Sequence, residues 1–494
     1  MRLGELLGKA GIIADGAGDE TVTGFAIDHR KVAPGTVFGA FEGATVNGED
    51  FIRPAIAAGA IAVVARPEAR VEGALHIADV TPRRAFARLA AGFFSPYPAT
   101  IVAVTGTNGK TSCVEMTRQI WRMAGERAAS IGTLGVTTPD GSVSTGLTTP
   151  DIVTFLGNMA GLAREGVTHV AYEASSHGLS QFRNEGLVVA ASAFTNFSRD
   201  HLDYHGTMEA YFAAKMRLFT EVVASGSPSV IHDAGDGSDW TAQAIATATA
   251  HGLDVRTVGE GGSFLRLTER EPTQLGQMLT IEHGGETRKV NLPLIGAYQA
   301  ANALVSAGLA LSTGIGASAV FDALTRLQPV RGRLERAGLN QAGAPAYVDY
   351  AHTPDALEAA IAALRPHVAP GGRLIAVFGA GGDRDTGKRP EMGEVAARAA
   401  DIAIVTDDNP RSEDPAAIRA AIMAGASGGL REIADRRAAI AAAIGEAGAA
   451  DIVLIAGKGH EQGQIFGSGE NMRIEAFDDV EVARECAGTG SLGA

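Results

Sequence analysis

The residues best suited to chemistry form the run TGTNGKT at positions 105–111, which follows an apolar strand and opens a helix. Glycines let the backbone curl around phosphate oxygens, and the amino end of a helix offers free N–H groups. In such a loop Lys110 would neutralise the β- and γ-phosphates, and the Thr111 hydroxyl would hold Mg²⁺. Val104 stands where the usual P-loop has its first glycine. The run therefore predicts a variant phosphate-binding loop, with a plain glycine turn as the alternative.

Two later segments could complete a metal–nucleotide site. Glu173 ends the apolar strand in THVAYEASSHGL, and carboxylate oxygens suit Mg²⁺ beside phosphates. Further on, His201 follows an acidic residue, and Lys215 lies among apolar residues of a helical stretch. Taken alone, Lys215 is better explained as a surface lysine whose aliphatic stem covers apolar side chains.

A third segment, DNPR at 408–411, follows the apolar strand in DIAIVTDD. Arg411 can offer a bidentate fork, which suits a planar carboxylate better than the point charge of a lysine. An amino acid with a second, distal amino-acid centre needs such a cation for its far carboxylate and an anion for its ammonium group. A proline turn with a solvated arginine explains the same residues equally well at this stage.

Apolar strands alternating with helices must position these segments, which predicts an α/β protein with largely parallel, buried sheets. Ligands bind beyond the carboxyl ends of such strands. The expected strands around the phosphate loop are 99–106, 168–175, 189–196 and 228–233, with a helix at 110–123. Those of the last part are 346–351, 373–380, 401–408 and 451–459.

The chain has 494 residues, a length that corresponds to roughly three domains. Prolines at 96 and 98 place the first boundary, and Leu327-Gln328-Pro329 places the second. The expected domains are therefore 1–96, 97–328 and 329–494.

Composition excludes several classes of protein. The formal net charge of −14 argues against general binding to nucleic acid or anionic membranes. With only two cysteines, Cys113 and Cys486, the composition argues against a disulfide framework and favours a reducing compartment. Residues 1–20 lack a signal-peptide core, and no apolar run approaches a membrane span. We therefore expect a cytoplasmic protein.

Taken together, six motifs resemble the Mur ligases, in order along nearly the whole chain. They are TGTNGKT, YEASSH, FTNFSRDHLDYHG with YFAAKMRLF, VDYAHTPDAL, DNPR and GKGHE. The resemblance implies an ATP-dependent ligase of peptidoglycan synthesis, and thus of cell-wall biogenesis, cell shape and cell division. It implies a small α/β domain that binds a UDP-sugar-peptide, a central P-loop ATPase-like domain with a mostly parallel sheet, and a C-terminal Rossmann-like domain that binds the amino acid.

Within this family the arginine of DNPR favours members that add meso-2,6-diaminopimelate over those that add L-lysine, which lack it. The expected reaction joins meso-diaminopimelate to UDP-N-acetylmuramoyl-L-alanyl-D-glutamate through an acyl phosphate, with ATP and Mg²⁺. The expected partners are these small molecules, and the chain is expected to act as a monomer. The resemblance does not identify the base for the amine, and His201, His205 and His352 stay open.

The resemblance also assigns roles to residues. Lys110, His201 and Lys215 are implied to be catalytic, with Lys215 carbamylated so that it holds a second Mg²⁺ with His201, while Thr111 and Glu173 hold the first. ATP contacts are implied for Gly106, Thr107, Asn108, Gly109, Lys110, Thr111, Ser112, Asn302, Arg333 and Asp349. UDP-sugar-peptide contacts are implied for Ile27, His29, Thr148, Thr149, Ser175, Gln181 and Arg183. Diaminopimelate contacts are implied for Arg384, Asp408, Asn409, Pro410, Arg411, Gly457 and Glu461.

Two positions depart from the family pattern. His29 stands where the family commonly has serine, and Tyr298-Gln299 replaces a usual Phe-Asn. A folylpolyglutamate synthase-like ligase is disfavoured by the segment IDHRKVAPGTVFGAFEG and by DNPR. A nucleotide-dependent switch would need an Asn-Lys-x-Asp guanine reader, which the sequence lacks. An inactive scaffold is disfavoured by the intact Lys110, Thr111, Glu173, His201 and Lys215.

Overall fold

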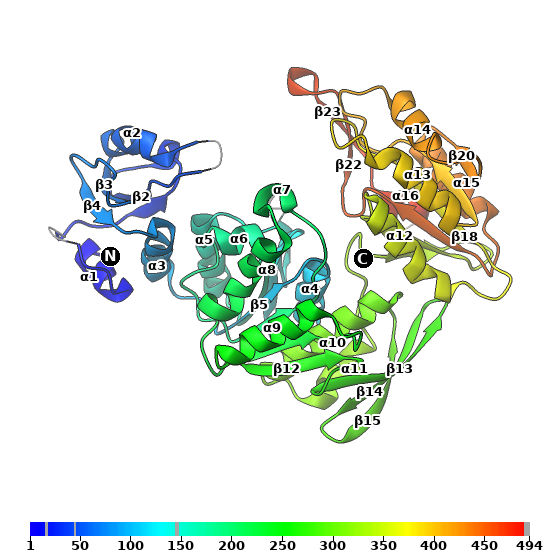
Figure 1. Cartoon of the computed structure of the whole chain (residues 1–494), viewed down its shortest axis with the longest axis horizontal. Helices are drawn as coiled ribbons and strands as arrows, with labels where there is room; N and C mark the ends of the chain where they lie inside the picture. Colours follow the sequence, from blue (N-terminus) through cyan, green and yellow to red (C-terminus); the bar gives the residue numbers. More distant parts are fainter. Residues whose placement is uncertain (15–17, 44–45, 144–147, 489–494) are drawn as a thin grey trace. The chain divides into compact units, whose positions relative to one another are not determined.

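The computed structural model describes residues 1–14, 18–43, 46–143 and 148–488. Contacts divide the chain into two compact units. Figure 1 labels their helices and strands. The first comprises residues 1–265 and 304–320, and the second comprises residues 266–303 and 321–494. Each unit is described by itself below. In the described part of the chain, no helix is long and apolar enough to cross a membrane.

The first unit begins with a four-stranded parallel sheet in the order β1-β2-β3-β4. Its strands are β1 Gly24–Ala26, β2 Thr36–Gly39, β3 Ala60–Ala65 and β4 Leu75–Ala78. Helix α2 (Ile52–Ala57) packs on one face, while α1 (Leu3–Ala10) and α3 (Pro82–Phe94) pack on the other. Because successive strand residues point to opposite faces, Val63 joins the core under α2 and Val64 the core under α3.

The same unit holds a larger sheet around the phosphate loop. Six strands run parallel in the order β12-β11-β10-β5-β9-β6. They are β5 Thr100–Thr105, β6 Ala128–Gly132, β9 His169–Glu173, β10 Ala191–Phe194, β11 Pro228–His232 and β12 Asp254–Gly259. The strands β7 (Gly135–Thr138) and β8 (Gly141–Val143) add antiparallel to β6. The four strands expected here are confirmed, and the antiparallel pair was not anticipated.

Helices connect these strands. They are α4 Lys110–Met123, α5 Ile152–Arg164, α6 Ser176–Ser180, α7 Leu202–His205, α8 Met208–Arg217 and α9 Asp239–Ala250, with a π-helical turn, η3, at Leu218–Val222. Helix α4 has the bounds expected from the sequence. Helix α10 (Ala297–Ser312) runs from the second unit into the first, and α11 (Ala317–Leu324) runs back.

In the second unit, β13 (Leu265–Thr273), β14 (Gly276–His283) and β15 (Glu286–Leu292) form an antiparallel meander. A six-stranded sheet follows in the order β16-β17-β21-β18-β19-β20. Its strands are β16 Glu335–Leu339, β17 Pro345–Asp349, β18 Leu374–Phe378, β19 Ile402–Val405, β20 Leu430–Glu432 and β21 Ile452–Ala456. Only β16 runs antiparallel to its neighbour among these described strands.

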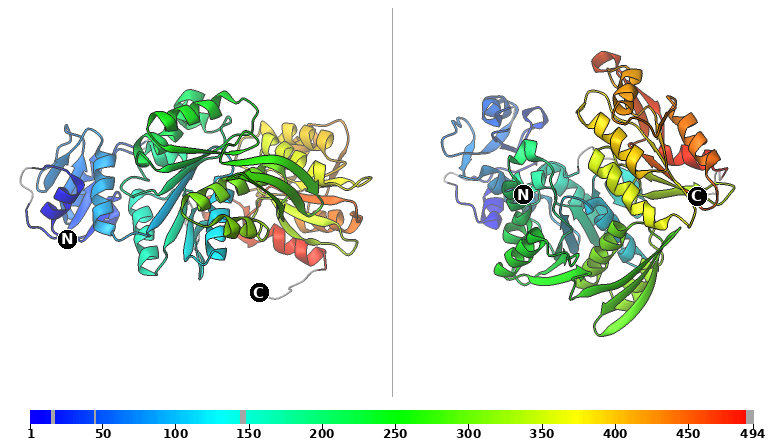
Figure 2. Two further views of the ribbon diagram at one scale, coloured as in Figure 1. Left: turned by 90° about the horizontal axis from the view of Figure 1, so that it is seen from below. Right: turned by 45° about the vertical axis from the view of Figure 1, so that its right-hand side comes forward.

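Helices cover both faces of this sheet (Figure 2). The helices α12 (Pro354–Leu364), α13 (Lys388–Ala399) and α14 (Pro415–Met423) pack on one face, and α15 (Arg436–Glu446) and α16 (Asp479–Cys486) pack on the other. Alternate residues of β18 divide between the two cores: Ala376 joins the first and Val377 the second. A hairpin of β22 (Gly463–Phe466) and β23 (Arg473–Ala476) lies beyond β21 in the chain. The predicted α/β class is confirmed.

Candidate active site

The phosphate loop lies between β5 and α4 and needs its glycines for different reasons. Gly109 has φ +85° at the start of α4, a backbone conformation that side-chain-bearing residues rarely adopt. A Cβ on Gly106 would lie 1.9 Å from the Thr195 hydroxyl. The residues after β10 hold the loop, because the Asn108 N–H donates to Asn196 Oδ1 at 2.9 Å and the Thr195 hydroxyl donates to the Asn108 carbonyl at 2.5 Å. The loop is thus pre-formed by contacts from a neighbouring strand.

The side chains of the loop lie close around its backbone. Lys110 Nζ donates to the carbonyl oxygens of Gly106 at 3.0 Å and Thr107 at 2.7 Å. Thr111 and Ser112 are buried in the first turn of α4. The amino end of this 14-residue helix therefore presents a lysine and two hydroxyl residues, the set that a triphosphate requires.

Lys215 is 1% exposed. The interpretation drawn from its neighbours alone, a surface lysine, is therefore wrong, whereas the family resemblance implied a place in the active site. Lys215 Nζ donates to the Gly106 carbonyl at 2.7 Å and lies 4.3 Å from the centroid of the Tyr211 ring. Burial lowers the pKa of Lys215 well below its ordinary value, and the nearby charge of Lys110 acts in the same direction. The neutral form of the Lys215 amine is therefore favoured beside the phosphate loop.

Glu173 lies at the carboxyl end of β9, next to the strand that leads into the loop. Its backbone is in register with Val104 of β5. The carboxylate is buried and accepts the Thr133 N–H at 2.7 Å on Oε1. Gly132 makes room for it, because a Cβ there would lie 2.1 Å from Oε1. A single carboxylate thus lies at the edge where a nucleotide-bound cation would sit.

Aromatic rings gather around His201, which has a left-handed backbone with φ +50°. Its ring lies 5.0 Å from that of His177 and 5.9 Å from that of Tyr211. His205 Nε2 is hydrogen-bonded to the Ser176 hydroxyl at 3.0 Å. Among the residues that the structure describes, no group of three or more His, Cys, Asp or Glu side chains is arranged to hold a metal ion. A cation here would need hydroxyl, phosphate or modified-lysine oxygens as well.

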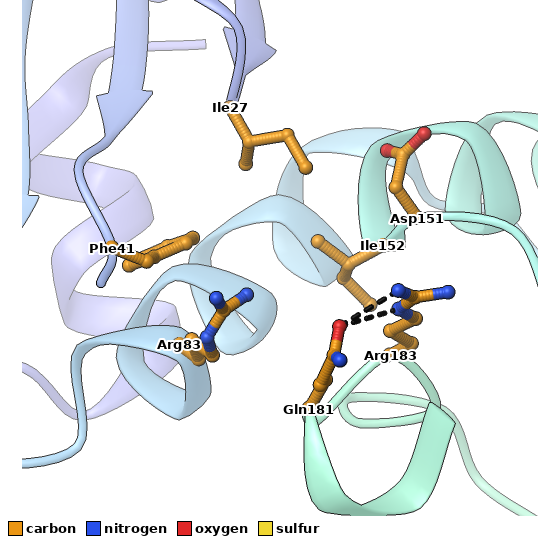
Figure 3. Close-up of a pocket in the computed structure, with 7 residues that line it drawn as sticks. All are labelled: Ile27, Phe41, Arg83, Asp151, Ile152, Gln181 and Arg183. Atoms are coloured by element: carbon orange, nitrogen blue, oxygen red, sulfur yellow. Dashed lines mark hydrogen bonds between the residues drawn. The ribbon is translucent and has the colours of Figure 1, made fainter. Parts of the chain in front are cut away.

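A pocket in the first unit collects several of the residues expected to contact the UDP-sugar-peptide (Figure 3). Arg183 donates to Gln181 Oε1 at 2.7 Å and to the Thr149 carbonyl at 2.8 Å. Burial lowers the pKa of the Arg83 guanidinium, and Arg183 adds repulsion, so two cations share this pocket. The lining residues are Ile27, Phe41, Arg83, Asp151, Ile152, Gln181 and Arg183.

Sequence reasoning missed four lining residues, Phe41, Arg83, Asp151 and Ile152. Phe41 lies in the segment IDHRKVAPGTVFGAFEG, but the other three stand outside the motifs named above. Of the other expected contacts, Ser175 Oγ is hydrogen-bonded to the Thr149 hydroxyl at 2.8 Å, and the Thr148 hydroxyl to that of Thr133 at 3.0 Å. His29 stacks on Phe51 with ring centroids 4.4 Å apart and does not line the pocket.

The remaining residues expected to contact ATP lie in the second unit and form a connected set. Asn302 Nδ2 donates to Gln299 Oε1 at 3.2 Å, and Gln299 Nε2 donates to the Arg333 carbonyl at 2.8 Å. Asp349 accepts the backbone N–H of Leu334 at 2.8 Å. Burial raises the pKa of Asp349, while Arg333 opposes this rise. Tertiary contacts therefore bring together three residues that are far apart in the sequence.

The DNPR segment follows β19 and is tied to β22. Arg411 has a left-handed backbone with φ +53°, and its N–H donates to the Ile465 carbonyl at 3.0 Å. Its guanidinium donates to the Gly382 carbonyl at 2.8 Å. Asp408 is buried, and its Oδ2 has no hydrogen-bond partner among the described residues. Gly457 leaves the space beside that oxygen open, since a Cβ there would lie 2.5 Å from it.

Other residues expected at this site lie at its edges. Glu461 Oε2 accepts the Asn409 amide at 2.8 Å. Arg384 is exposed. His352, one of the three candidate bases, is hydrogen-bonded through Nδ1 to the Tyr350 carbonyl at 2.8 Å. Desolvation by neighbouring residues lowers the pKa of His352, with Lys388 and Arg333 acting in the same direction, and this favours the neutral ring.

A pre-formed phosphate loop at the edge of a parallel sheet defines a nucleotide-dependent α/β enzyme. Residues 104–310 match the Mur ligase middle domain, residues 332–459 match the Mur ligase glutamate ligase domain, and residues 21–94 match the Mur ligase family catalytic domain. The chain belongs to the Mur ligase family.

Its relatives cover nearly the whole chain. The UDP-N-acetylmuramoyl-L-alanyl-D-glutamate–2,6-diaminopimelate ligase of Zymomonas mobilis is 58% identical, over 97% of this chain and 98% of its own length. The ligase of the same name from Bradyrhizobium diazoefficiens is 52% identical, over 97% and 98%. A solved structure of a ligase of this name matches with a TM-score of 0.76 and 32% identity, over 99% of both chains. A Mycobacterium tuberculosis folylpolyglutamate synthase shares the fold alone, with a TM-score of 0.60 and 20% identity over 76% of this chain and 92% of its own.

Proposed function

We propose that this chain is an ATP-dependent acid–amino-acid ligase that adds meso-2,6-diaminopimelate to UDP-N-acetylmuramoyl-L-alanyl-D-glutamate in peptidoglycan synthesis. The names of its close relatives support this reaction. The observation that carries the choice of amine is Arg411, which lies three positions after Asp408 and can pair with a distal carboxylate, a group that L-lysine lacks. Asp408 Oδ2, which is buried without a hydrogen-bond partner among the described residues, suits the ammonium group of either amine. A buried carboxylate oxygen without a partner is costly unless a ligand supplies one, and an ammonium group does so. Arg411 then recognises the distal carboxylate.

The first half of the reaction is proposed to take place at the phosphate loop. The γ-carboxylate oxygen of the D-glutamyl residue attacks the γ-phosphorus, the bond from phosphorus to the β–γ bridging oxygen breaks, and ADP leaves. Lys110 offsets repulsion between the carboxylate and the triphosphate, and the N–H groups at the start of α4 orient the phosphates. Positioning and charge stabilisation supply most of the acceleration in such transfers.

Magnesium fits the groups around this loop. Thr111, Glu173 and His201 offer hydroxyl, carboxylate and imidazole ligands, and Lys215 would add oxygens if its neutral amine took up CO₂ as a carbamate. Burial beside Lys110 supports that modification, because it favours the neutral amine that reacts with CO₂. When bound, Mg²⁺ supplies positive charge to the phosphate oxygens.

In the second half, the amine of diaminopimelate loses a proton and attacks the acyl carbon, and the tetrahedral intermediate releases phosphate as the amide forms. Exclusion of water protects the acyl phosphate from hydrolysis. Asp408 and Glu461 are proposed to hold ammonium groups, with Arg384 and Arg411 on carboxylates. The proton acceptor is one of His201, His205 and His352.

The pocket of Figure 3 is proposed to hold the UDP-sugar end of the first substrate. Arg83 and Arg183 are two cations that a diphosphate would pair with, and Ile27 and Phe41 offer apolar surface. We further propose that the chain works as a monomer in the cytoplasm. Its domains are proposed to span residues 1–96, 97–328 and 329–494, which bind the UDP-sugar-peptide, ATP and the amino acid in turn.

The test is phosphate release with ATP, Mg²⁺ and UDP-N-acetylmuramoyl-L-alanyl-D-glutamate, comparing meso-diaminopimelate with L-lysine. Turnover is expected with meso-diaminopimelate alone. Arg411→Ala should lower kcat/KM for this amine by about 10²-fold, the value of a charge-assisted bidentate contact. Arg411→Lys should restore little, because a lysine lacks the fork.

The matched control is Arg473→Ala, an exposed arginine of the same unit that pairs with Glu475. It should leave kcat/KM unchanged. Preference for L-lysine would keep the ligase and reject the role of Arg411. Absence of turnover with either amine would reject the reaction.

A further inference from the structure

Lys458, in the segment after β21, is completely buried at 0% side-chain exposure. Its Nζ donates to Asn409 Oδ1 at 3.0 Å and to the Gly463 carbonyl at 2.5 Å, and it lies 3.5 Å from Glu461 Oε2. The expected substrate contacts in its motif, Gly457 and Glu461, flank it in the sequence. The reaction proposed above assigns no role to this lysine.

The contacts of Asn409 define which way its amide points. Asn409 is 2% exposed, and its Oδ1 accepts both Lys458 Nζ and the Ile465 N–H at 3.0 Å. With two donors on one side, the oxygen must face them, and the Nδ2 group must face the opposite side. There it donates to Glu461 Oε2 at 2.8 Å. The amide therefore links the buried ammonium group to the carboxylate of Glu461.

Exposure to solvent increases from Lys458 through Asn409 to Glu461. Lys458 is fully buried, Asn409 is nearly so, and the Glu461 side chain is 32% exposed. Of the three, Glu461 is the most accessible to a ligand that arrives from solvent. One oxygen of the Glu461 carboxylate is held by Asn409 and lies near Lys458, so its orientation is decided from inside the protein.

We propose that Lys458 is a positioning residue for the amine substrate: through Asn409 it orients the Glu461 carboxylate toward an ammonium group. This inference rests on the function proposed above. It extends the specificity site inward from Asp408 and Glu461 to a cation that the substrate does not touch. A neutral side chain at 458 would leave the Asn409 oxygen with the Ile465 N–H alone and would remove the cation 3.5 Å from Glu461 Oε2. The Glu461 carboxylate would then be held less firmly, so the amine would bind more weakly while phosphoryl transfer would not change.

Lys458 Nζ also donates to the Gly463 carbonyl at the start of β22 and thereby stabilises the hairpin. A loss of stability in a Lys458 variant would therefore not by itself test the inference. The discriminating quantity is KM for each substrate. In Lys458→Met, a side chain of similar length, we expect KM for meso-diaminopimelate to rise about tenfold, the loss of one charge-assisted contact. KM for ATP, KM for the UDP-sugar-peptide and kcat should stay within about twofold, since uniform binding alone is lost.

A double-mutant cycle tests whether Lys458 acts through Glu461. In a Glu461→Gln background, Lys458→Met should change KM for the amine by less than about twofold, because the effects of substitutions within one network are not additive. If the two effects multiply, Lys458 does not act through Glu461 and the inference is overturned. An unchanged KM for the amine in Lys458→Met overturns it too.

If Lys458→Met does not fold, Asn409→Asp tests the link through which Lys458 is proposed to act on Glu461. This change retains an oxygen for Lys458 and replaces the Nδ2 donor by an oxygen that faces Glu461. The same selective rise in KM for the amine is expected, and an unchanged KM overturns the inference.

Arg373→Met is the control for stability, because it removes a cation that pairs with Asp451 at the start of β18, away from DNPR in the sheet. It should leave KM for the amine unchanged at equal folded fraction. The wild-type enzyme separates the two proposals. If it does not use meso-diaminopimelate, the proposed function fails; if it does and Lys458→Met matches it, only this inference fails.

Discussion

Two buried lysines, Lys215 in the first unit and Lys458 in the second, lie in opposite electrostatic surroundings. Burial lowers the pKa of both. Around Lys215 the next largest influence is Lys110, a second cation, and Asp200 opposes it. Around Lys458 the leading influence after burial is Asp408, which favours the charged form.

The difference shows which buried charges the protein compensates itself and which it leaves for a ligand to compensate. Burying a charge costs free energy unless a counter-charge and hydrogen bonds offset it. The second unit supplies acidic groups and the Asn409 amide to Lys458 from within the chain. At the phosphate loop Lys110 and Lys215 lie close together, which suits the binding of a triphosphate and the proposed carbamate on Lys215. The free energy of unfolding should therefore depend on the buried cations that are paired with acidic groups, and the catalytic activity on Lys215, which is repelled by Lys110.

The largest effect that we expect, and the strongest test of this comparison, is the loss of activity when Lys215 is replaced. Lys215→Met should lower kcat by about 10²- to 10³-fold, the usual result of removing a group that stabilises transition-state charge. It should not lower the melting temperature, because it removes a buried amine that is repelled by Lys110. Phosphate release and thermal unfolding measure the two quantities.

The carbamate can be observed separately. With ¹³C-bicarbonate, the wild-type protein should show a carbamate carbon resonance that Lys215→Met lacks. A large fall in melting temperature together with full activity per folded molecule would reverse the assignment of Lys215.

The opposite outcome is expected for Arg436, a fully buried cation of the second unit that is paired with Asp479. Arg436 and Asp479 are both 0% exposed and form an ion pair at 2.6 Å. Arg436→Met leaves a buried carboxylate uncompensated, which should cost about 3–5 kcal/mol of unfolding free energy. Denaturant titration measures this loss. The neighbour Arg437 pairs with Glu485 at the surface, and Arg437→Met should leave stability nearly unchanged.

The surroundings of Arg83 are intermediate between those of Lys215 and Arg436, because its pocket holds both a second cation, Arg183, and an acidic group, Asp151. Arg83→Ala should raise KM for the UDP-sugar-peptide by about tenfold, the value of one charge-assisted hydrogen bond. KM for ATP and for the amine should not change. Arg88→Ala, on the exposed side of the same helix, is the control. Equal changes in all three KM values would remove Arg83 from the substrate site.

The smallest effect is a pH dependence of stability. The pKa of Lys215 is lower in the folded than in the unfolded protein, so between the lowered value and 10.5 the unfolded state binds more protons. Stability should therefore rise with pH in this window, by at most about 1.4 kcal/mol per pH unit. The difference in unfolding free energy between wild type and Lys215→Met, in CO₂-free buffer, should show this slope. A flat difference would contradict the lowered pKa.

Much of the fold was predictable because its signals are local. The strand, glycine turn and helix around 105–123 are contiguous, and each glycine is required by the backbone itself. The alternation of apolar strands and helices predicted the parallel sheets in the same way. The hairpin of β22 and β23 was missed, since its strands are mostly solvent-accessible and lack an apolar run.

By itself, the sequence determined the α/β class, the phosphate loop and the DNPR segment, because each depends on residues close together in the chain. Only the tertiary structure decided which cations are buried and what they meet. Lys215 and Lys458 both stand in motifs that carry the family resemblance, but no local pattern shows that they are buried, because their burial depends on residues distant in the chain. Arg83 joins Arg183 across a hundred residues for the same reason. Desolvation and long-range contact are properties of packed elements, and periodicity and motif spacing carry no record of them.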